Sequence, residues 1–172
     1  WIEAMQLITL GVASRYGADT GGHTWADFEQ GMAILAELGD RYSQAVGHQS
    51  AARAYLQAGD LASAERHFEQ AIPLFDEHGY LLSANVGRSG LADIARLQGD
   101  YERALALYPA VIRVWRLADQ RGAMARCLEC LGFTAGSQAA DPLPLLRRAA
   151  TLYGAAEAIR RINNAPMTPW EQ

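Results

Sequence analysis

The chain has 172 residues, half of them hydrophobic, and carries a formal net charge of -4 at pH 7 with a pI near 5.5. This length and composition support a buried core and exclude disorder, while the acidic balance argues against a surface that neutralises nucleic-acid phosphates. No apolar run reaches the roughly 18 to 20 residues of a membrane span, no secretory signal is visible, and two cysteines make no disulfide framework. We therefore expect a cytoplasmic protein that contacts neither membrane nor nucleic acid directly.

The first forty residues predict two helices separated by a glycine-rich loop. The loop runs from Gly17 to Gly22, and Thr24 is placed to cap a second helix that begins late. A longer linker and a small binding loop both remain open for this segment. Gly39-Asp40 ends this first segment of about forty residues, because glycine suits the left-handed position after a helix and aspartate caps the next one.

The next forty residues, 41–80, form a second copy of this two-helix pattern. They contain two segments with apolar residues at three- and four-residue spacings, Ala45 to Ala58 and Ala64 to Phe75. This spacing is typical of helices and differs from the strict alternation of a half-buried strand. Gly59-Asp60 separates the two segments in the same way as Gly39-Asp40. Pro73 falls inside the second segment, where proline removes a backbone hydrogen bond, so we expect a kink or an early helix end there.

A shift of forty residues brings the later copies into step with the second one. Gly59-Asp60 then meets Gly99-Asp100, and Phe68 meets Phe28 on one side and Tyr108 on the other. Pro109 again lies inside a predicted second helix, and Asp141-Pro142 is a further helix start. The sequence therefore predicts one all-α domain over residues 1–172, made of four helix pairs (about 1–40, 41–80, 81–120 and 121–160) and a C-terminal tail.

The order of small residue, aromatic residue, Gly-Asp turn, alanine and aromatic residue resembles the tetratricopeptide (TPR) repeat. It is carried by Ala51-Ala52, Tyr55, Gly59-Asp60, Ala64, Phe68 and Ala71, and again by Leu91-Ala92, Gly99-Asp100-Tyr101, Ala104 and Tyr108. The resemblance implies a right-handed α-solenoid with a period of about forty residues, longer than the usual 34.

Two further segments are similar to the long-repeat arrays of bacterial regulators. They are Glu37-Leu38-Gly39-Asp40 and the stretch from Leu152 to Arg160 that is followed by Ala165-Pro166. Such arrays occur in the C-terminal regions of regulators like the maltose regulator, of LuxR-type and SARP-type regulators, and of related predicted ATPases. The resemblance implies that the chain is part of a larger regulator whose ATPase and DNA-binding parts lie elsewhere.

No pattern of catalytic residues stands out. Cys127 and Cys130 form a single C-x-x-C that lacks the second ligand pair of a zinc site, and Cys127 takes the place of Gly47 and Gly87, which favours a packing role. The four histidines lack metal-ligand spacing, and the stretch from Gly87 to Gly90 lacks the spacing of a nucleophile elbow. We expect no enzyme activity, no cofactor and no metal.

The resemblance implies that the first helix of each pair faces a partner on the concave side of the array. The positions in copies two to four are Gln49, Arg53, Gln57, Ser89, Asp93, Arg96, Arg126, Glu129 and Phe133, and the first copy adds Gln6 and Thr9. Three arginines on one wall would suit a carboxylate or a phosphate, so we expect an acidic partner. The alternative is that Asp93 and Glu129 pair with these arginines and leave a neutral surface.

The leading functional hypothesis is a protein-docking or signal-receiving module. The alternatives are a sensor for a peptide or small molecule, and a self-assembly module that forms homodimers through its terminal repeats. We also expect apolar surface at one end of the chain, because it opens on Trp1-Ile2 within an amphipathic pattern.

Overall fold

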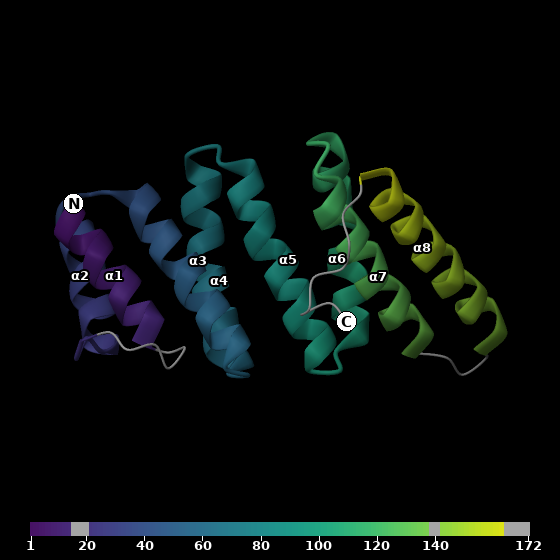
Figure 1. Ribbon diagram of the computed structural model, residues 1–172, viewed down its shortest axis with the longest axis horizontal. Coiled ribbons are helices and arrows are strands. Elements are labelled where there is room, and N and C mark those ends of the chain that lie inside the picture. The colour runs from purple at the N-terminus through teal and green to yellow at the C-terminus, as the bar shows by residue number, and fades with distance from the viewer. Residues whose placement is uncertain (15–20, 138–141, 164–172) are drawn as a thin grey trace. The chain divides into compact units, whose positions relative to one another are not determined.

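The computed structural model describes residues 1–14, 21–137 and 142–163, and this part of the chain holds eight α-helices and no strand. The all-α prediction is therefore confirmed for the described residues. None of the eight helices is long and apolar enough to cross a membrane. The helices are α1 (Ile2–Ser14), α2 (Trp25–Glu37), α3 (Arg41–Gln57), α4 (Leu61–Glu77), α5 (Leu81–Leu97), α6 (Tyr101–Leu117), α7 (Arg121–Ser137) and α8 (Pro142–Asn163) (Figure 1).

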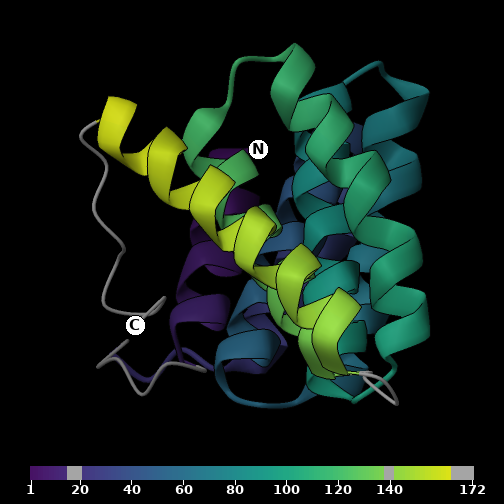
Figure 2. The same ribbon diagram turned by 90° about the vertical axis from the view of Figure 1, so that its right-hand side faces the viewer.

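The chain divides into two compact units, Trp1–Gly90 and Leu91–Gln172, and α5 contributes residues to both. In the first unit, α1 packs against α2 and α3, and α3 packs against α2 and α4. In the second unit, α7 packs against α6 and α8, and Figure 2 brings α8 to the front of the view. Helices that follow one another in the sequence are thus neighbours within each unit.

The second helix of each of the first three pairs buries the same stripe of residues. Phe68, Ala71 and Phe75 of α4 are spaced by three and four residues, so they share one helical face. The stripe recurs forty residues earlier in α2 and forty residues later in α6, as Phe28, Gly31 and Leu35, and as Tyr108, Val111 and Trp115. Phe68 and Tyr108 are almost completely buried, so both belong to the core.

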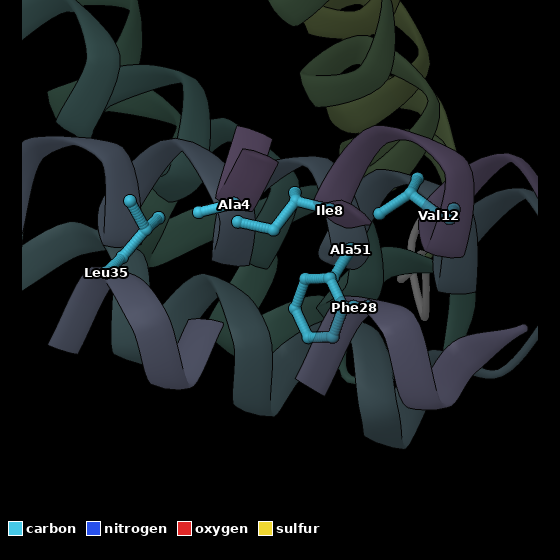
Figure 3. Close-up of a cluster of buried hydrophobic side chains, with 7 residues drawn as sticks. Ala4, Ile8, Val12, Phe28, Leu35 and Ala51 are labelled. Carbon is cyan, nitrogen blue, oxygen red and sulfur yellow. The ribbon is translucent and has the colours of Figure 1, made fainter. Parts of the chain in front are cut away.

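The core of the first pair forms where α1 and α2 meet, and α3 closes it. Figure 3 shows Ile8 of α1, Phe28 and Leu35 of α2, and Ala51 of α3 in one cluster. Gly31 allows the close approach of α1 and α2, because a Cβ atom there would lie 2.6 Å from the carbonyl oxygen of Ala4. The small side chain at this position is therefore a packing requirement.

Gly-Asp pairs end one helix and start the next, as the sequence predicts. Gly59 and Gly99 have φ angles of 79° and 80°, which glycine adopts without steric cost. The side chains of Asp60 and Asp100 accept hydrogen bonds from the backbone N–H of Ser63 at 3.0 Å and of Arg103 at 3.1 Å. Asp40 caps α3 in the same way.

The starts of α2 and α8 also agree with the sequence. Thr24 caps α2, which begins late at Trp25, and Asp27 completes a capping box with it. Helix α8 begins at Pro142. Residues 15–20 of the glycine-rich loop, Asp141, and Ala165-Pro166 of the closing segment lie outside the described residues.

Of the two outcomes expected at the prolines, a kink or an early helix end, the early end does not occur. Helix α4 continues past Pro73 to Glu77, and α6 continues past Pro109 to Leu117. Both prolines are exposed, so water can bond the carbonyl group that each leaves without its usual donor. Beyond each proline a large buried side chain packs the helix against the core: Phe75 in α4 and Trp115 in α6.

Candidate interaction surface

The candidate residues of α3 form a row at four-residue spacing in the first unit. Arg53 and Gln57 are exposed, and Arg53 makes no ion pair with any described residue. Gln49 is half-buried and donates a hydrogen bond from Nε2 to the carbonyl oxygen of Ser83 at 2.9 Å. The row therefore offers solvent one guanidinium group and one amide, while its third member holds α3 to α5.

The remaining candidates of the first unit differ in exposure. Gln6 and Thr9 are exposed on α1, where they line a shallow hollow with Trp1 and Ile2. Trp1 and Ile2 are themselves largely exposed, so apolar surface lies at this helix. Ser89 is only 3% exposed and lies inside the unit.

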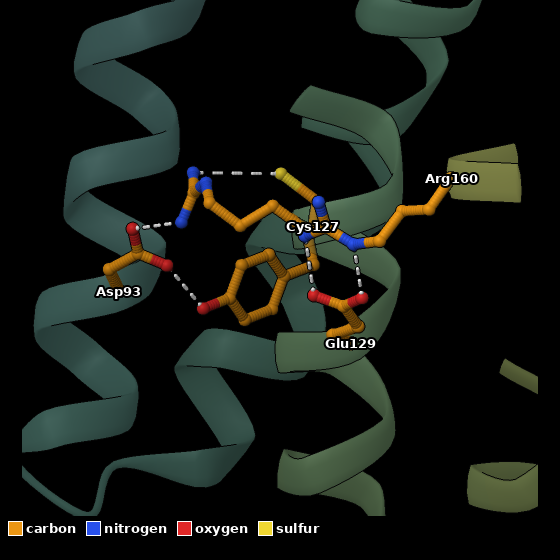
Figure 4. Close-up of polar contacts among 6 residues, drawn as sticks. Asp93, Cys127, Glu129 and Arg160 are labelled. Carbon is orange, nitrogen blue, oxygen red and sulfur yellow. Dashed lines mark hydrogen bonds and ion pairs between the residues drawn. The ribbon is translucent and has the colours of Figure 1, made fainter. Parts of the chain in front are cut away.

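In the second unit, Asp93 of α5 binds groups from two other helices. Its Oδ1 atom accepts a hydrogen bond from the Tyr108 hydroxyl of α6 at 2.7 Å, and its Oδ2 atom accepts one from Arg126 Nη1 of α7, also at 2.7 Å. Figure 4 shows the carboxylate between these two partners. Asp93 and Arg126 are partly buried, with side chains 15% and 30% exposed.

Burial and the charge of Asp93 both shift the pKa values of its neighbours. Burial, together with this carboxylate, raises the pKa of Tyr108, so the phenol stays a donor. Burial opposes the charged form of Arg126, but Asp93 together with Cys127 and Cys130 outweighs it, and the pKa of the guanidinium rises. Burial and Asp93 also raise the pKa of Cys130, which keeps this thiol neutral.

Glu129 of α7 is bound by an arginine of the last helix. Arg160 Nε and Nη2 donate to the two carboxylate oxygens of Glu129 at 2.8 and 2.9 Å. This is a bidentate pair, the geometry in which arginine and carboxylate interact most strongly. Arg160 is 7% exposed, so the pair ties α8 to α7 away from water.

Arg96 of α5 lies over the ring of Phe133 of α7, with its guanidinium carbon 5.7 Å from the ring centroid. Its Nε atom is buried and makes no hydrogen bond within the described chain, and the side chain forms no ion pair with a described carboxylate. Phe133 is 49% exposed. Arg96 and Phe133 therefore combine a cation without a carboxylate partner and an accessible apolar ring.

The structure brings five sequence candidates together in this unit: Asp93, Arg96, Arg126, Glu129 and Phe133. Together with Arg160, these residues supply two carboxylates and three guanidinium groups. One positive charge is therefore in surplus, at Arg96. The expected pairing of acids with arginines holds for Asp93 with Arg126. Glu129 instead pairs with Arg160, so the surface is not neutral.

Sequence reasoning misses two members of this network, Tyr108 and Arg160. Tyr108 occupies the position of Phe28 and Phe68, and the hydroxyl that it adds requires a partner once buried. That difference between copies is the signal that points to it. No comparable signal identifies Arg160, which lies 31 residues from Glu129.

The cysteines of the C-x-x-C are free thiols beside this network. Cys127 is buried and Cys130 is half-buried. Arg126 Nη2 lies 3.8 Å from Cys127 Sγ. Within the described residues, no group of three or more His, Cys, Asp or Glu side chains is arranged to hold a metal ion.

Comparison with protein-family models finds none that matches this chain, and comparison with curated proteins finds no relative.

Proposed function

We propose that the chain is a non-catalytic protein-interaction module of the TPR type, part of a bacterial transcriptional regulator, and that it binds an acidic peptide segment through α5 and α7. The forty-residue recurrence of buried stripes and Gly-Asp turns supports the repeat assignment. The assignment to a regulator rests on the similarity of the Glu37–Asp40 turn and of the closing segment to such arrays.

The observation that carries the proposal is the pair of Arg96 and Phe133. A guanidinium group without a carboxylate partner attracts a carboxylate, and the ring beside it offers apolar contact. An acidic peptide with one apolar side chain next to an Asp or Glu satisfies both groups. Asp93 and Glu129 accept hydrogen bonds from Arg126 and Arg160, and the charge of Asp93 also acts on Arg96.

The test is a peptide array with Asp or Glu flanking a Leu or Phe, probed with the protein and with its Arg96→Met variant. Methionine keeps the unbranched apolar stem against Phe133 and removes the charge. We expect binding to weaken roughly tenfold or more, because hydrogen bonds to charged groups contribute about 1.5–3 kcal/mol.

The matched control is Arg113→Met, which removes an exposed arginine from α6 in the same unit. It should leave acidic-peptide binding unchanged, and the thermal melts of all three proteins should agree closely. Arg126 is unsuitable for this test, because its removal would leave Asp93 partly buried without a cation. Equal binding by the protein and its Arg96→Met variant, or equal binding of Lys-substituted peptides, would refute the proposal.

A further inference from the structure

A second feature of the Leu91–Gln172 unit is a small hollow at the meeting point of the end of α6, the start of α7 and the end of α8. Its volume is about 190 Å³. Trp115, Met124, Ile159 and Ile162 supply apolar walls. Because a protein cavity of about 150 Å³ can hold benzene, this hollow has room for a ring or a branched aliphatic group.

Trp115 lines this hollow and carries a hydrogen-bond donor on its indole ring. The side chain is 6% exposed, and its indole Nε1 makes no hydrogen bond within the described chain. The equivalent positions of the earlier copies are Leu35 and Phe75, which carry no donor. Buried donors are nearly always paired in proteins, so the Trp115 donor points to an acceptor supplied from outside the chain.

The turn beside the hollow is also unlike the other turns. Asp119 has a φ angle of 52° and is the one described non-glycine residue with a positive φ, whereas the residues forty and eighty positions earlier, Gly79 and Gly39, are glycines. Its Oδ1 atom accepts a hydrogen bond from Arg121 Nε at 2.7 Å. An aspartate held in this unfavourable conformation keeps Arg121 at the hollow, and such strain gathers at ligand sites.

The charged groups of the hollow leave one cation in excess. Asp119 and Arg121 balance each other. Arg116 also lines the hollow, and its side chain makes no ion pair with any described residue. A ligand that fits must therefore be small, apolar over most of its surface, and anionic at one end.

We propose that this hollow binds a small apolar carboxylate. Its ring or branched carbon chain packs against Met124 and Ile159, and its carboxylate accepts hydrogen bonds from the Trp115 indole and from Arg116. None of the residues of this site belongs to the Arg96–Phe133 surface. This small-molecule site is separate from the proposed peptide-binding surface. A negative result for one of the two proposals therefore leaves the other standing.

The test uses the ¹⁵N-labelled full chain and the NMR signal of the Trp115 indole N–H, which is identified by its loss in Trp115→Phe. If that variant does not fold, nuclear Overhauser contacts to the Met124 methyl group identify the signal instead. The probes are phenylacetate and 4-methylpentanoate, each compared with its amide, which keeps the oxygen acceptor and lacks the charge. We expect the Trp115 signal to move downfield and to saturate by about 10 mM acid, with the amides roughly tenfold weaker.

Arg116→Met should reduce the affinity for both acids to that of the amides, while Arg113→Met, one turn earlier on an exposed face of α6, should not change it. The signal of Trp25 in the first unit should stay in place throughout. The proposal is overturned if no probe gives a saturable shift of the Trp115 signal by about 10 mM. It is equally overturned if acids and amides bind alike, or if Arg116→Met binds the acids as the unaltered protein does.

Discussion

At the scale of single residues, a histidine pair stands apart from both proposed sites. His48 of α3 and His67 of α4 place their Nδ1 atoms 3.1 Å apart, so one ring donates to the other and both are neutral. Burial, with His67 nearby, lowers the pKa of His48 to about 4. Burial and the charge of Arg66 lower the pKa of His67 as well. Tyr55 stacks on the His67 ring, and Trp25 and Phe28 contact it edge-on.

The pair predicts a loss of stability in mild acid. The unfolded His48 imidazole takes up a proton near pH 6.5, whereas the folded one does so only near pH 4, so stability falls as pH drops through this window. About 1.36 kcal/mol per pKa unit, reduced for partial exposure, gives a loss on the order of 1–3 kcal/mol. Urea unfolding at pH 7 and near pH 4.5 measures it.

His48→Gln is the informative variant for this loss, because glutamine still offers His67 a hydrogen bond but takes up no proton. Its unfolding free energy should fall less between the two pH values than that of the unaltered protein. His78→Gln, at an exposed site after α4, should behave like the unaltered protein. Acidic groups contribute equally to all three proteins, so an unchanged pH dependence in His48→Gln would exclude the pair as the cause.

At the scale of elements, the helices and their ends can be predicted because their causes are local. Asp60 and Asp100 cap the helices that follow them, and their bonds span three residues of sequence. The continuation of α4 and α6 through Pro73 and Pro109 cannot be predicted in this way, because it depends on packing farther along the helix. The same holds for the pair of Glu129 and Arg160, whose contact depends on how α8 lies against α7.

Removal of Glu129 should loosen α8. Glu129→Ala removes the carboxylate that Arg160 binds with two hydrogen bonds, and breaking a buried pair by removing one member costs about 3–5 kcal/mol. We expect faster amide hydrogen exchange over residues 147–162, with little change in α3 and α4. Hydrogen-exchange mass spectrometry resolves these helices.

Glu157→Ala is the matched control, since it breaks the Glu157–Arg161 pair on the exposed side of the same helix. Exposed pairs contribute about 0–1 kcal/mol, so exchange in α8 should hardly change. Similar exchange in the two variants would mean that the Glu129–Arg160 pair does not hold α8 in place.

At the scale of the whole molecule, the forty-residue recurrence can be read from the sequence, because core stripes and turns repeat residue by residue. The candidate site is predictable only in part. The resemblance to TPR modules implies the positions Asp93, Arg96, Arg126, Glu129 and Phe133, but which acid pairs with which arginine depends on side chains of α6 and α8. The division into two compact units has no counterpart in the sequence pattern, because α5 continues without interruption across the boundary.

The two units should lose structure separately when one of them is weakened. In repeat arrays each helix pair is stabilised mainly by its neighbours, so a local defect need not unfold the whole chain. Leu35→Ala removes a fully buried side chain from the first unit, at a cost of about 2–5 kcal/mol, and Glu129→Ala weakens the second. At a low urea concentration, Leu35→Ala should increase hydrogen exchange in α1 and α2 while α6 and α7 stay protected, and Glu129→Ala should do the reverse. Simultaneous loss of protection in all helices of both variants would show instead that α5 joins the two units into one cooperative structure.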